Sequence, residues 1–355
     1  MLTNGPIVRC PDCCYPGVSS LSSFDSVPTS PLSIDAREEI WPLKQPFRIS
    51  RGSRTEAQIV VLTVSDGKHI GRGESVPLSR YNQSVASVLA QIESVQGDKN
   101  LNRQSLQSLL PAGAARNALD CALWDLEAKI SGKRIWEMAN ILIAPEVETS
   151  FTISLDTPEK MEAVAKANAR LSILKLKLAG DDRDLPRVEA VRKAAPAARL
   201  LIDANESWSP EHYQRIVPPL KRLGVELIEQ PFPAKADAAL EVLDHPIPVC
   251  ADESCHTTGD LPGLTNLYEV INVKLDKTGG LTEALHLCER ARDSGFKLLI
   301  GCMVCTSLAI APARLLATFA NWIDLDGPLL LARDRDHGVL YAKGRIGIPS
   351  RELWG

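Results

Sequence analysis

The amino-acid sequence predicts a (β/α) barrel that follows a smaller α+β domain. From about residue 148, short apolar runs recur roughly every 22–28 residues, and each is followed by a helix-like segment, as in repeating βα units. Eight such runs fit a barrel better than an open sheet, because no glycine-rich dinucleotide fingerprint opens the series. The predicted strands are residues 149–155, 173–178, 200–204, 225–229, 249–251, 270–275, 297–301 and 322–325.

Residues 1–31 differ from the rest of the chain, because they are rich in Pro, Ser and Gly and show no sustained periodicity. They predict a poorly ordered N-terminal extension. Cys10, Cys13 and Cys14 could form half of a zinc knuckle. No second pair follows at a suitable spacing, so the extension is the favoured interpretation.

Residues 32–145 are the predicted α+β domain, and residues 146–329 are the predicted barrel domain. A basic loop is expected at residues 47–54, whose three arginines either form a solvated face or meet an acidic ligand group. The clearest helix has alanines and leucines along one face. The strands and helices predicted before the barrel are residues 33–41, 58–65, 70–74, 84–96, 103–110 and 114–129.

Charged side chains stand where the apolar runs of the predicted barrel stop, and these strand ends are where barrel active sites collect. Lys175 and Lys177 alternate with leucines, so both amines point to one face of a strand. An exposed edge strand guarded by lysines would explain this pair alone. The regular acids that follow favour an active site instead. The strand-end residues are Asp203 with Asn205, Glu229, Asp252 with Glu253, Lys274, and Asp324 with Asp326.

Asp203, Glu229 and Asp252 come from three consecutive predicted strands. Carboxylates that converge on one point repel each other unless a cation lies between them. Oxygen ligands without His or Cys favour a hard ion, so we predict one Mg²⁺ per subunit, with unrelated salt-bridged acids as the alternative. A zinc site at Cys255 and His256 is disfavoured, because adjacent residues point apart along an extended chain.

Lys177 and Lys274 lie on the second and sixth predicted strands, across the barrel from each other. A carbon held between them could lose a proton to one amine and gain one from the other. A carboxylate bound to the metal would stabilise the enediolate that forms, and Lys175 would lower the pKa of the neighbouring base.

The two ends of the expected cavity carry opposite charges. Asp324 and Asp326 offer a seat for a substrate ammonium group, and Arg51 and Arg54 from the first domain could meet an anionic side chain. A peptide-like zwitterion fits this description.

These motifs resemble those of the dipeptide epimerases of the enolase superfamily, most closely its L-Ala-D/L-Glu epimerases. The resemblance spans about residue 33 to the C-terminus. The matching stretches include Lys-Leu-Lys at 175–177, Asp-Ala-Asn-Glu-Ser-Trp at 203–208, Glu-Gln-Pro at 229–231, Ala-Asp-Glu-Ser at 251–254, Lys-Leu-Asp-Lys-Thr-Gly-Gly at 274–280 and Asp-Leu-Asp at 324–326.

The resemblance implies a modified (β/α)7β TIM barrel under a capping domain that residues 330–355 complete. In the family pattern, Arg54 would meet a glutamyl carboxylate, and the loop at residues 77–81 would close over the site. Leu308 departs from the polar residue expected in the closest relatives. The implied site residues are Lys177, Lys274 and Lys175 for catalysis, Asp203, Glu229 and Asp252 for Mg²⁺, and Arg54, Arg51, Tyr81, Thr152, Ser307, Asp324 and Asp326 for substrate.

The implied activity is inversion of the α-carbon of the C-terminal residue of a dipeptide, with L-Ala-D-Glu and L-Ala-L-Glu of murein peptide metabolism as expected substrates. The alternatives on the same scaffold are epimerisation of other dipeptides, cycloisomerisation and o-succinylbenzoate synthesis. The last two use substrates without an ammonium group, so Asp324 and Asp326 argue against them. A non-catalytic binding protein is disfavoured by the complete set of lysines and acids.

The overall composition excludes several other classes of protein. A net charge of −4 gives no reason to expect nucleic acid or a membrane surface as partner. No apolar run is long enough for a membrane helix, and no secretory signal is recognised. Nine scattered cysteines favour a reducing cytoplasm. Cys302 and Cys305 have redox spacing but fall at a strand end, so dithiol chemistry is disfavoured. A homo-oligomer is left open.

Overall fold

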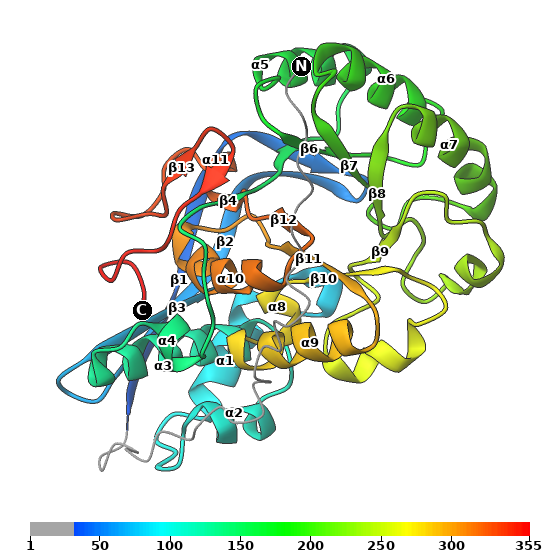
Figure 1. The fold of residues 1–355 in the computed structure, drawn as a ribbon. Coiled ribbons are helices and arrows are strands. Elements are labelled where there is room, and N and C mark those ends of the chain that lie inside the picture. Colours follow the sequence, from blue (N-terminus) through cyan, green and yellow to red (C-terminus); the bar gives the residue numbers. More distant parts are fainter. Residues whose placement is uncertain (1–31) are drawn as a thin grey trace.

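The computed structural model describes residues 32–355, so the predicted N-terminal extension with Cys10, Cys13 and Cys14 lies outside the described residues. Within this range, an antiparallel sheet comes first, a barrel of eight parallel strands follows, and a small C-terminal sheet packs beside it. Figure 1 shows the long blue strands of the first sheet running past the barrel, with cyan helices at their lower end.

The first sheet has the strand order β1-β2-β3, and both pairings are antiparallel. Ser84 and Asn102 start the first two helices, because their side chains accept hydrogen bonds from backbone N–H groups of the first turn. The elements are β1 (Ser33–Ile49), β2 (Gly52–Ser65), β3 (Ile70–Ser75), the 3-10 turn η1 (Ser79–Tyr81), α1 (Val85–Ser94), α2 (Arg103–Leu109), α3 (Ala114–Ser131) and α4 (Ile135–Met138).

The second half of strand β2, from Ile59, is buried on both faces, which joins this sheet to the barrel. Val60, Leu62 and Val64 pack with buried residues of α1, α2 and α3. Ile59 and Val61, on the opposite face, belong to the cluster that also contains the barrel core. Because side chains alternate along a strand, one apolar run serves both contacts.

Two glycines of β3 allow helix α3 to lie directly on the sheet. A Cβ atom at Gly71 would lie 2.0 Å from the carbonyl oxygen of Ala122, and one at Gly73 would lie 1.9 Å from that of Ala118. Any side chain there would therefore push the helix away from the strand.

The prediction of a loop at residues 47–54 is wrong, because strands β1 and β2 extend through most of this segment. Phe47 pairs with Arg54 and Ile49 with Gly52, so β1 and β2 form a hairpin whose turn is Ser50 and Arg51. The ladder shifts register between Pro42 and Phe47.

The barrel is confirmed, and each of its eight strands overlaps a predicted apolar run. The strand order runs without interruption from β12 to β5, and every pairing is parallel. The backbone N–H of Ser150 donates to the carbonyl oxygen of Ile323 (2.9 Å), which joins the last strand to the first. The strands are β5 (Phe151–Ile153), β6 (Ile173–Lys177), β7 (Arg199–Asp203), β8 (Val225–Glu229), β9 (Val249–Ala251), β10 (Val270–Val273), β11 (Lys297–Gly301) and β12 (Trp322–Asp324).

The connections between strands run outside the barrel, as the green helices in Figure 1 show. Two crossovers hold only 3-10 turns, and the eighth strand is followed only by the four-residue helix α11, which gives the modified (β/α)7β form. The connecting elements are α5 (Pro158–Ala167), α6 (Asp184–Ala194), α7 (Pro210–Arg222), η2 (Ala238–Val242), η3 (Thr258–Gly263), α8 (Leu275–Thr278), α9 (Leu281–Asp293), α10 (Ser307–Leu315), η4 (Leu316–Phe319) and α11 (Gly327–Leu330).

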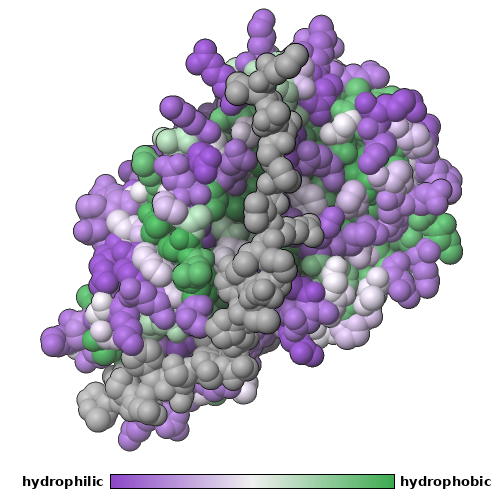
Figure 2. All heavy atoms as spheres, viewed as in Figure 1, coloured by the Kyte–Doolittle hydropathy of each residue, from purple (hydrophilic) through white to green (hydrophobic). Residues whose placement is uncertain are grey.

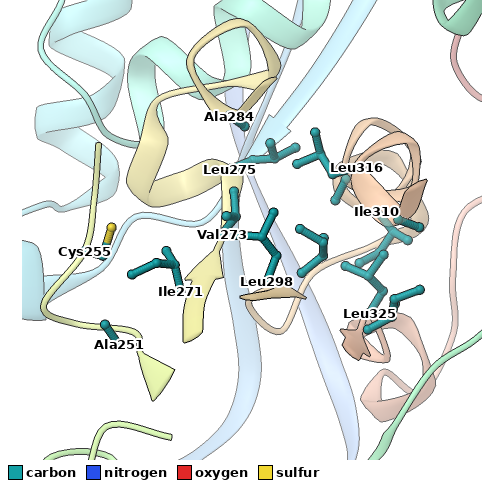
Figure 3. Close-up of a cluster of buried hydrophobic side chains, with 14 of the residues drawn as sticks. Ala251, Cys255, Ile271, Val273, Leu275, Ala284, Leu298, Ile310, Leu316 and Leu325 are labelled. Carbon is teal, nitrogen blue, oxygen red and sulfur yellow. The ribbon is translucent and has the colours of Figure 1, made fainter. Parts of the chain in front are cut away.

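The barrel strands bury apolar side chains on two sides. Facing outward, residues such as Ile271, Val273 and Leu298 pack against Ala284 and Ile310 of the surrounding helices (Figure 3). Facing inward, one cluster closes the amino ends of the strands. Its members are Ile173, Leu201, Leu227, Cys250, Val270, Leu299 and Trp322.

The C-terminal residues return to the first sheet and its helices. The indole N–H of Trp354 donates to the carbonyl oxygen of Cys121 on α3 (3.0 Å), and the backbone N–H of Gly355 donates to Asp125 (2.7 Å). The predicted domain boundaries, at residues 145 and 330, remain predictions. The third sheet joins β4 (Val147–Glu148), which precedes the barrel, to β13 (Tyr341–Ala342) and β14 (Arg345–Ile346) near the C-terminus.

The described surface is largely polar in the view of Figure 2, with smaller apolar areas between hydrophilic side chains. Over residues 32–355, we find no helix with both the length and the apolar character that a membrane crossing demands. The six cysteines in this range are all free thiols.

Candidate active site

A cavity of about 470 Å³ lies at the carboxyl ends of the barrel strands, between the barrel and the tip of the β1–β2 hairpin. Residues from both parts of the chain form its walls, as the sequence predicted. Of the predicted site residues, those that line this cavity are Arg51, Arg54, Tyr81, Thr152, Lys175, Lys177, Asp252, Lys274, Asp324 and Asp326.

Three predicted site residues do not line the cavity. Asp203 and Glu229 are fully buried directly beneath it, where they contact the lysines. Ser307 is turned elsewhere: its hydroxyl group donates to Asp334 and accepts the backbone N–H of Val339. Leu308 is a buried core residue.

Strand register brings Lys177, Asp203 and Glu229 to one level of the barrel. Lys177 is the ladder partner of Asp203, which is the ladder partner of Glu229. Because side chains alternate along β6, Lys175 points into the same interior one layer lower. An edge-strand interpretation of the lysines is excluded, since β6 is central and completely buried.

The two lysines proposed for catalysis contact different acids. Lys177 Nζ lies 2.5 Å from Asp203 Oδ2, and Lys274 Nζ lies 2.6 Å from Asp252 Oδ2. Glu229 lies between these pairs, 3.7 Å from Lys274 Nζ through Oε1. Both amines border the same cavity. A small substrate there would therefore meet an amine from each of two strands, β6 and the end of β10.

Lys175 connects the floor of the site. Its Nζ atom lies 2.5 Å from Glu229 Oε2 and 2.6 Å from Asp324 Oδ2, and the side chain is 1% exposed. Burial disfavours its charge, but Asp324 and Glu229 outweigh this and raise the pKa of Lys175 well above its ordinary value. Lys175 is therefore a fixed positive charge in this arrangement.

The pKa values of the buried acids are shifted in opposite directions by their surroundings. Burial opposes ionisation of Asp203, but Lys177 and Lys175 outweigh it and lower the pKa of its carboxyl. Burial and the negative charge of Asp203 raise the pKa of Glu229, although Lys175 is in contact with it. One buried cluster thus holds carboxyls of low and of raised pKa, which is typical of functional sites.

The three predicted metal ligands offer only oxygen donors. Among residues 32–355, no three acidic, histidine or cysteine side chains stand close enough to hold a metal ion in the present arrangement, because each acid is turned onto a lysine. Two buried oxygens, Glu229 Oε2 and Asp252 Oδ1, touch a lysine but accept no well-aligned hydrogen bond. Carboxylate oxygens of this kind are the ligands that a hard divalent cation takes.

The predicted ammonium seat lies at the end of β12. Asp324 accepts a hydrogen bond from the hydroxyl group of Ser150, and Asp326 accepts one from the backbone N–H of Thr152 (2.6 Å). Burial and the neighbouring Asp324 raise the pKa of Asp326 to about 7. A cation that binds here would relieve this cost, because it would favour the ionised carboxylate.

The arginines of the hairpin tip behave differently from one another. Arg51 binds Glu253 (2.7 Å), Glu206 (3.0 Å) and a backbone carbonyl, so its charge is already compensated. The Arg54 side chain makes no hydrogen bond or ion pair with other residues of the described range and is exposed at the cavity wall. Of these two arginines, Arg54 is the one free to bind an anion.

The turn η1 closes another side of the cavity. Arg80 binds Glu206 through two hydrogen bonds (2.8 and 2.6 Å), and the neighbouring Tyr81 packs edge-on against His256 with ring centroids 4.5 Å apart. Cys255 is instead buried in the core, so the adjacent Cys255 and His256 do point apart. Among the described residues, Cys255 and His256 belong to no group of three potential metal ligands.

Two family models match the chain, one described as enolase C-terminal domain-like over residues 159–351 and one as the N-terminal domain of mandelate racemase/muconate lactonizing enzyme over residues 32–139. The chain is 48% identical to the L-Ala-D/L-Glu epimerase of Escherichia coli (strain K12), over 87% of this chain and 97% of that protein. The chain belongs to the dipeptide epimerases of the enolase superfamily. The predicted family and the prediction of an isomerase are confirmed.

Solved structures of this family agree with the fold. An enolase family member from Agrobacterium tumefaciens with homology to dipeptide epimerases, with bound sodium and L-Ala-L-Glu, is 47% identical, with a TM-score of 0.90 over 92% of this chain and 100% of that one. A dipeptide epimerase from Methylococcus capsulatus, complexed with Mg and L-Arg-D-Lys, is 29% identical, with a TM-score of 0.83 over 90% of this chain and 97% of that one.

Sequence reasoning missed two residues that shape the candidate active site of this family member. Lys277 Nζ lies 2.7 Å from Asp252 Oδ1, on the side away from the cavity, and donates to the carbonyl oxygens of Asp252 and Asn272. Glu206 binds both Arg51 and Arg80. The Lys-Leu-Asp-Lys stretch was a signal for the first, because residues three apart share one side of a helical turn. Glu206 lies in the Asp-Ala-Asn-Glu-Ser-Trp stretch, but that pattern assigned it no role.

Proposed function

We propose that this protein is a Mg²⁺-dependent dipeptide epimerase that inverts the α-carbon of the C-terminal residue, acting on L-Ala-D-Glu and L-Ala-L-Glu. The observation that carries the proposal is the approach of Lys177 and Lys274 to one cavity from two strands, with acids between them. The proposal is supported by the relative named L-Ala-D/L-Glu epimerase, which covers almost the whole chain.

Lys177 and Lys274 would exchange the α-proton of the substrate. One amine removes the proton from one face of the carbon, and the other amine, as an ammonium, delivers a proton to the opposite face. The reverse reaction exchanges the two roles, so both epimers serve as substrates. Lys175, held between Glu229 and Asp324, would keep a permanent positive charge beneath the reacting carbon.

Asp203, Glu229 and Asp252 would hold one Mg²⁺ per subunit. When bound, the ion would take the α-carboxylate of the substrate and stabilise the negative charge that builds up as the α-proton leaves. Without the ion, Asp252 outweighs the opposing effect of burial and raises the pKa of Lys274 well above its ordinary value. With Mg²⁺ bound to Asp252, this effect on Lys274 would be lost. Lys274 could thus become a base at neutral pH.

Both ends of the dipeptide have charged partners in the cavity. Asp324 and Asp326 would bind the α-ammonium group, and Arg54 would bind the glutamyl side chain, since it has no ion-pair partner of its own among the described residues. An ammonium seat favours dipeptides over the carboxylate-only substrates of a cycloisomerase or o-succinylbenzoate synthase. Murein peptides contain the L-Ala-Glu pair, so we place the enzyme in cytoplasmic murein peptide metabolism.

The deciding experiment is incubation of L-Ala-L-Glu with enzyme and Mg²⁺ in D₂O, followed by NMR and chiral analysis. We expect deuterium at the α-carbon of the glutamyl residue together with its inversion. L-Ala-L-Gln serves as the control for Arg54: Arg54→Ala should raise KM for the glutamyl dipeptide and leave that for the glutaminyl dipeptide nearly unchanged.

Two single variants test the assignment of the lysines. Lys177→Ala and Lys274→Ala should each abolish epimerisation, and each should still exchange the α-proton of one epimer only, with opposite preference. If either variant epimerises at the wild-type rate, or if the wild type takes up no deuterium, the proposed function is wrong.

A further inference from the structure

A second cavity of about 480 Å³ lies beside the candidate active site, a volume within the range of small-molecule pockets. It is formed by β1, β5, α5 and α11. None of the roles proposed above uses it.

The two cavities share part of their walls. Phe47, Thr152 and Leu330 line both of them and therefore form the partition between them. The partition lies beside the proposed ammonium seat, because the backbone N–H of Thr152 donates to Asp326 (2.6 Å). The first residue of a bound dipeptide would thus lie next to this partition.

Phe47 is the aromatic member of the partition and the one whose side chain lies beside Lys177. Thr152 is a buried strand residue in ladder contact with Lys175, and Leu330 ends helix α11. The Phe47 ring follows the register shift of β1, and its centroid lies 6.0 Å from Lys177 Nζ. The ring therefore stands between the catalytic lysine and the second cavity.

The second cavity suits an apolar occupant. Its floor consists of hydrophobic side chains such as Phe151, Met161 and Val164. Three of the four charged residues in its wall are paired with each other: Asp156 binds both Arg48 (2.6 Å) and Lys160 (3.2 Å). The fourth, Lys44, is exposed, and its ammonium group donates to the carbonyl oxygen of Leu329 (3.0 Å).

We propose that Phe47 sets the substrate range of this enzyme, because its ring restricts the N-terminal residue of the dipeptide to a small side chain and closes off an apolar cavity that would hold a larger one. This inference rests on the proposed function. The ligand class for the opened cavity is the aliphatic side chain of an N-terminal residue such as leucine.

The test compares kcat/KM for L-Leu-L-Glu with kcat/KM for L-Ala-L-Glu in each variant. Phe47→Ala should raise this ratio at least about tenfold, since additional methylene groups in a hydrophobic pocket change specificity by roughly 10–200-fold. Phe151→Ala is the matched control: it removes the same atoms from the second cavity and leaves the partition intact, so the ratio should stay at the wild-type value. Adding Val164→Phe to Phe47→Ala should fill the cavity and reverse the gain.

The proposal is overturned if Phe47→Ala turns over L-Ala-L-Glu with an unchanged ratio, or if Phe151→Ala raises the ratio equally. Phe47→Leu, a milder change, should give an intermediate ratio and replaces the alanine variant if that variant does not fold. A crystal structure of the Phe47 variant tests the partition apart from turnover, because two separate cavities would refute it. Failure of the wild type on L-Ala-L-Glu would instead refute the proposed function.

Discussion

Asp276 ties the barrel to the first sheet through a carboxyl group that folding should keep protonated. It lies on α8 and is buried. Its Oδ1 atom accepts hydrogen bonds from the backbone N–H of Val76 (2.9 Å) and from the side-chain amide of Asn117 (2.8 Å). Burial raises the pKa of Asp276 to about 7, against the effect of these two hydrogen bonds, and Glu74 adds to the increase. The perturbation we consider is Asp276→Asn.

The sign of the effect follows from the raised pKa. Between pH 4 and pH 7, the folded state binds a proton at Asp276 that the unfolded state has released, so the free energy of unfolding falls as pH rises through this window. A change from the ordinary value of 3.8 to about 7 corresponds to at most about 4 kcal/mol, at about 1.4 kcal/mol per pKa unit. Asparagine does not ionise, and its single carbonyl oxygen can keep both hydrogen bonds.

The assay is urea denaturation of wild type and variant at intervals from pH 4.5 to pH 8. We expect the two proteins to be similarly stable at the acidic end and Asp276→Asn to become the more stable one by up to about 4 kcal/mol above pH 7. Taking the difference between the two proteins removes the contribution of other titrating groups. A difference that does not change with pH, or one of opposite sign, would refute this reasoning.

Three further predictions concern the site itself. Glu206→Gln removes the charge that holds Arg51 and Arg80. We expect KM for L-Ala-L-Glu to rise about tenfold with a smaller change in kcat, since a charged hydrogen bond contributes about 1.5–3 kcal/mol. Steady-state kinetics that show a loss in kcat alone would contradict this. Lys277→Met should lower the free energy of unfolding by about 3–5 kcal/mol, because the buried Asp252 loses one of its two lysine partners. Denaturation midpoints equal to those of the wild type would exclude the effect. Removal of divalent ions with EDTA should stop α-proton exchange, and Mg²⁺ at 100 times its Kd should then stabilise the fold by about 2.7 kcal/mol; full activity without metal would rule out the metal site.

The barrel was predictable because its strands are buried on both sides. Parallel strands of this kind read as short continuous apolar runs, and the runs around Leu200, Val225 and Lys297 are found in strands β7, β8 and β11. The two crossovers with 3-10 turns and the extended hairpin were not predictable, because packing between distant segments fixes them and local propensity does not.

The candidate site was predictable as a set of residue types but not as a set of contacts. Strand ends and period-two alternation bring Lys177 and Lys274 to one cavity, so their common location follows from local pattern. Ser307 begins helix α10 after the end of strand β11, and its hydroxyl group turns to Asp334 on another segment. Only the folded chain could show that choice.

By itself, the sequence determined the architecture and the inventory of lysines and acids at the mouth of the barrel, because burial and alternation are written into neighbouring residues. The tertiary structure decided the pairs: Lys177 with Asp203, Lys274 and Lys277 on the two oxygens of Asp252, and Phe47 as a wall between two cavities. The physical reason is the separation in sequence between the residues that make contact. Contacts across a barrel depend on the register and side-chain rotamers of segments up to hundreds of residues apart, which a local pattern does not specify.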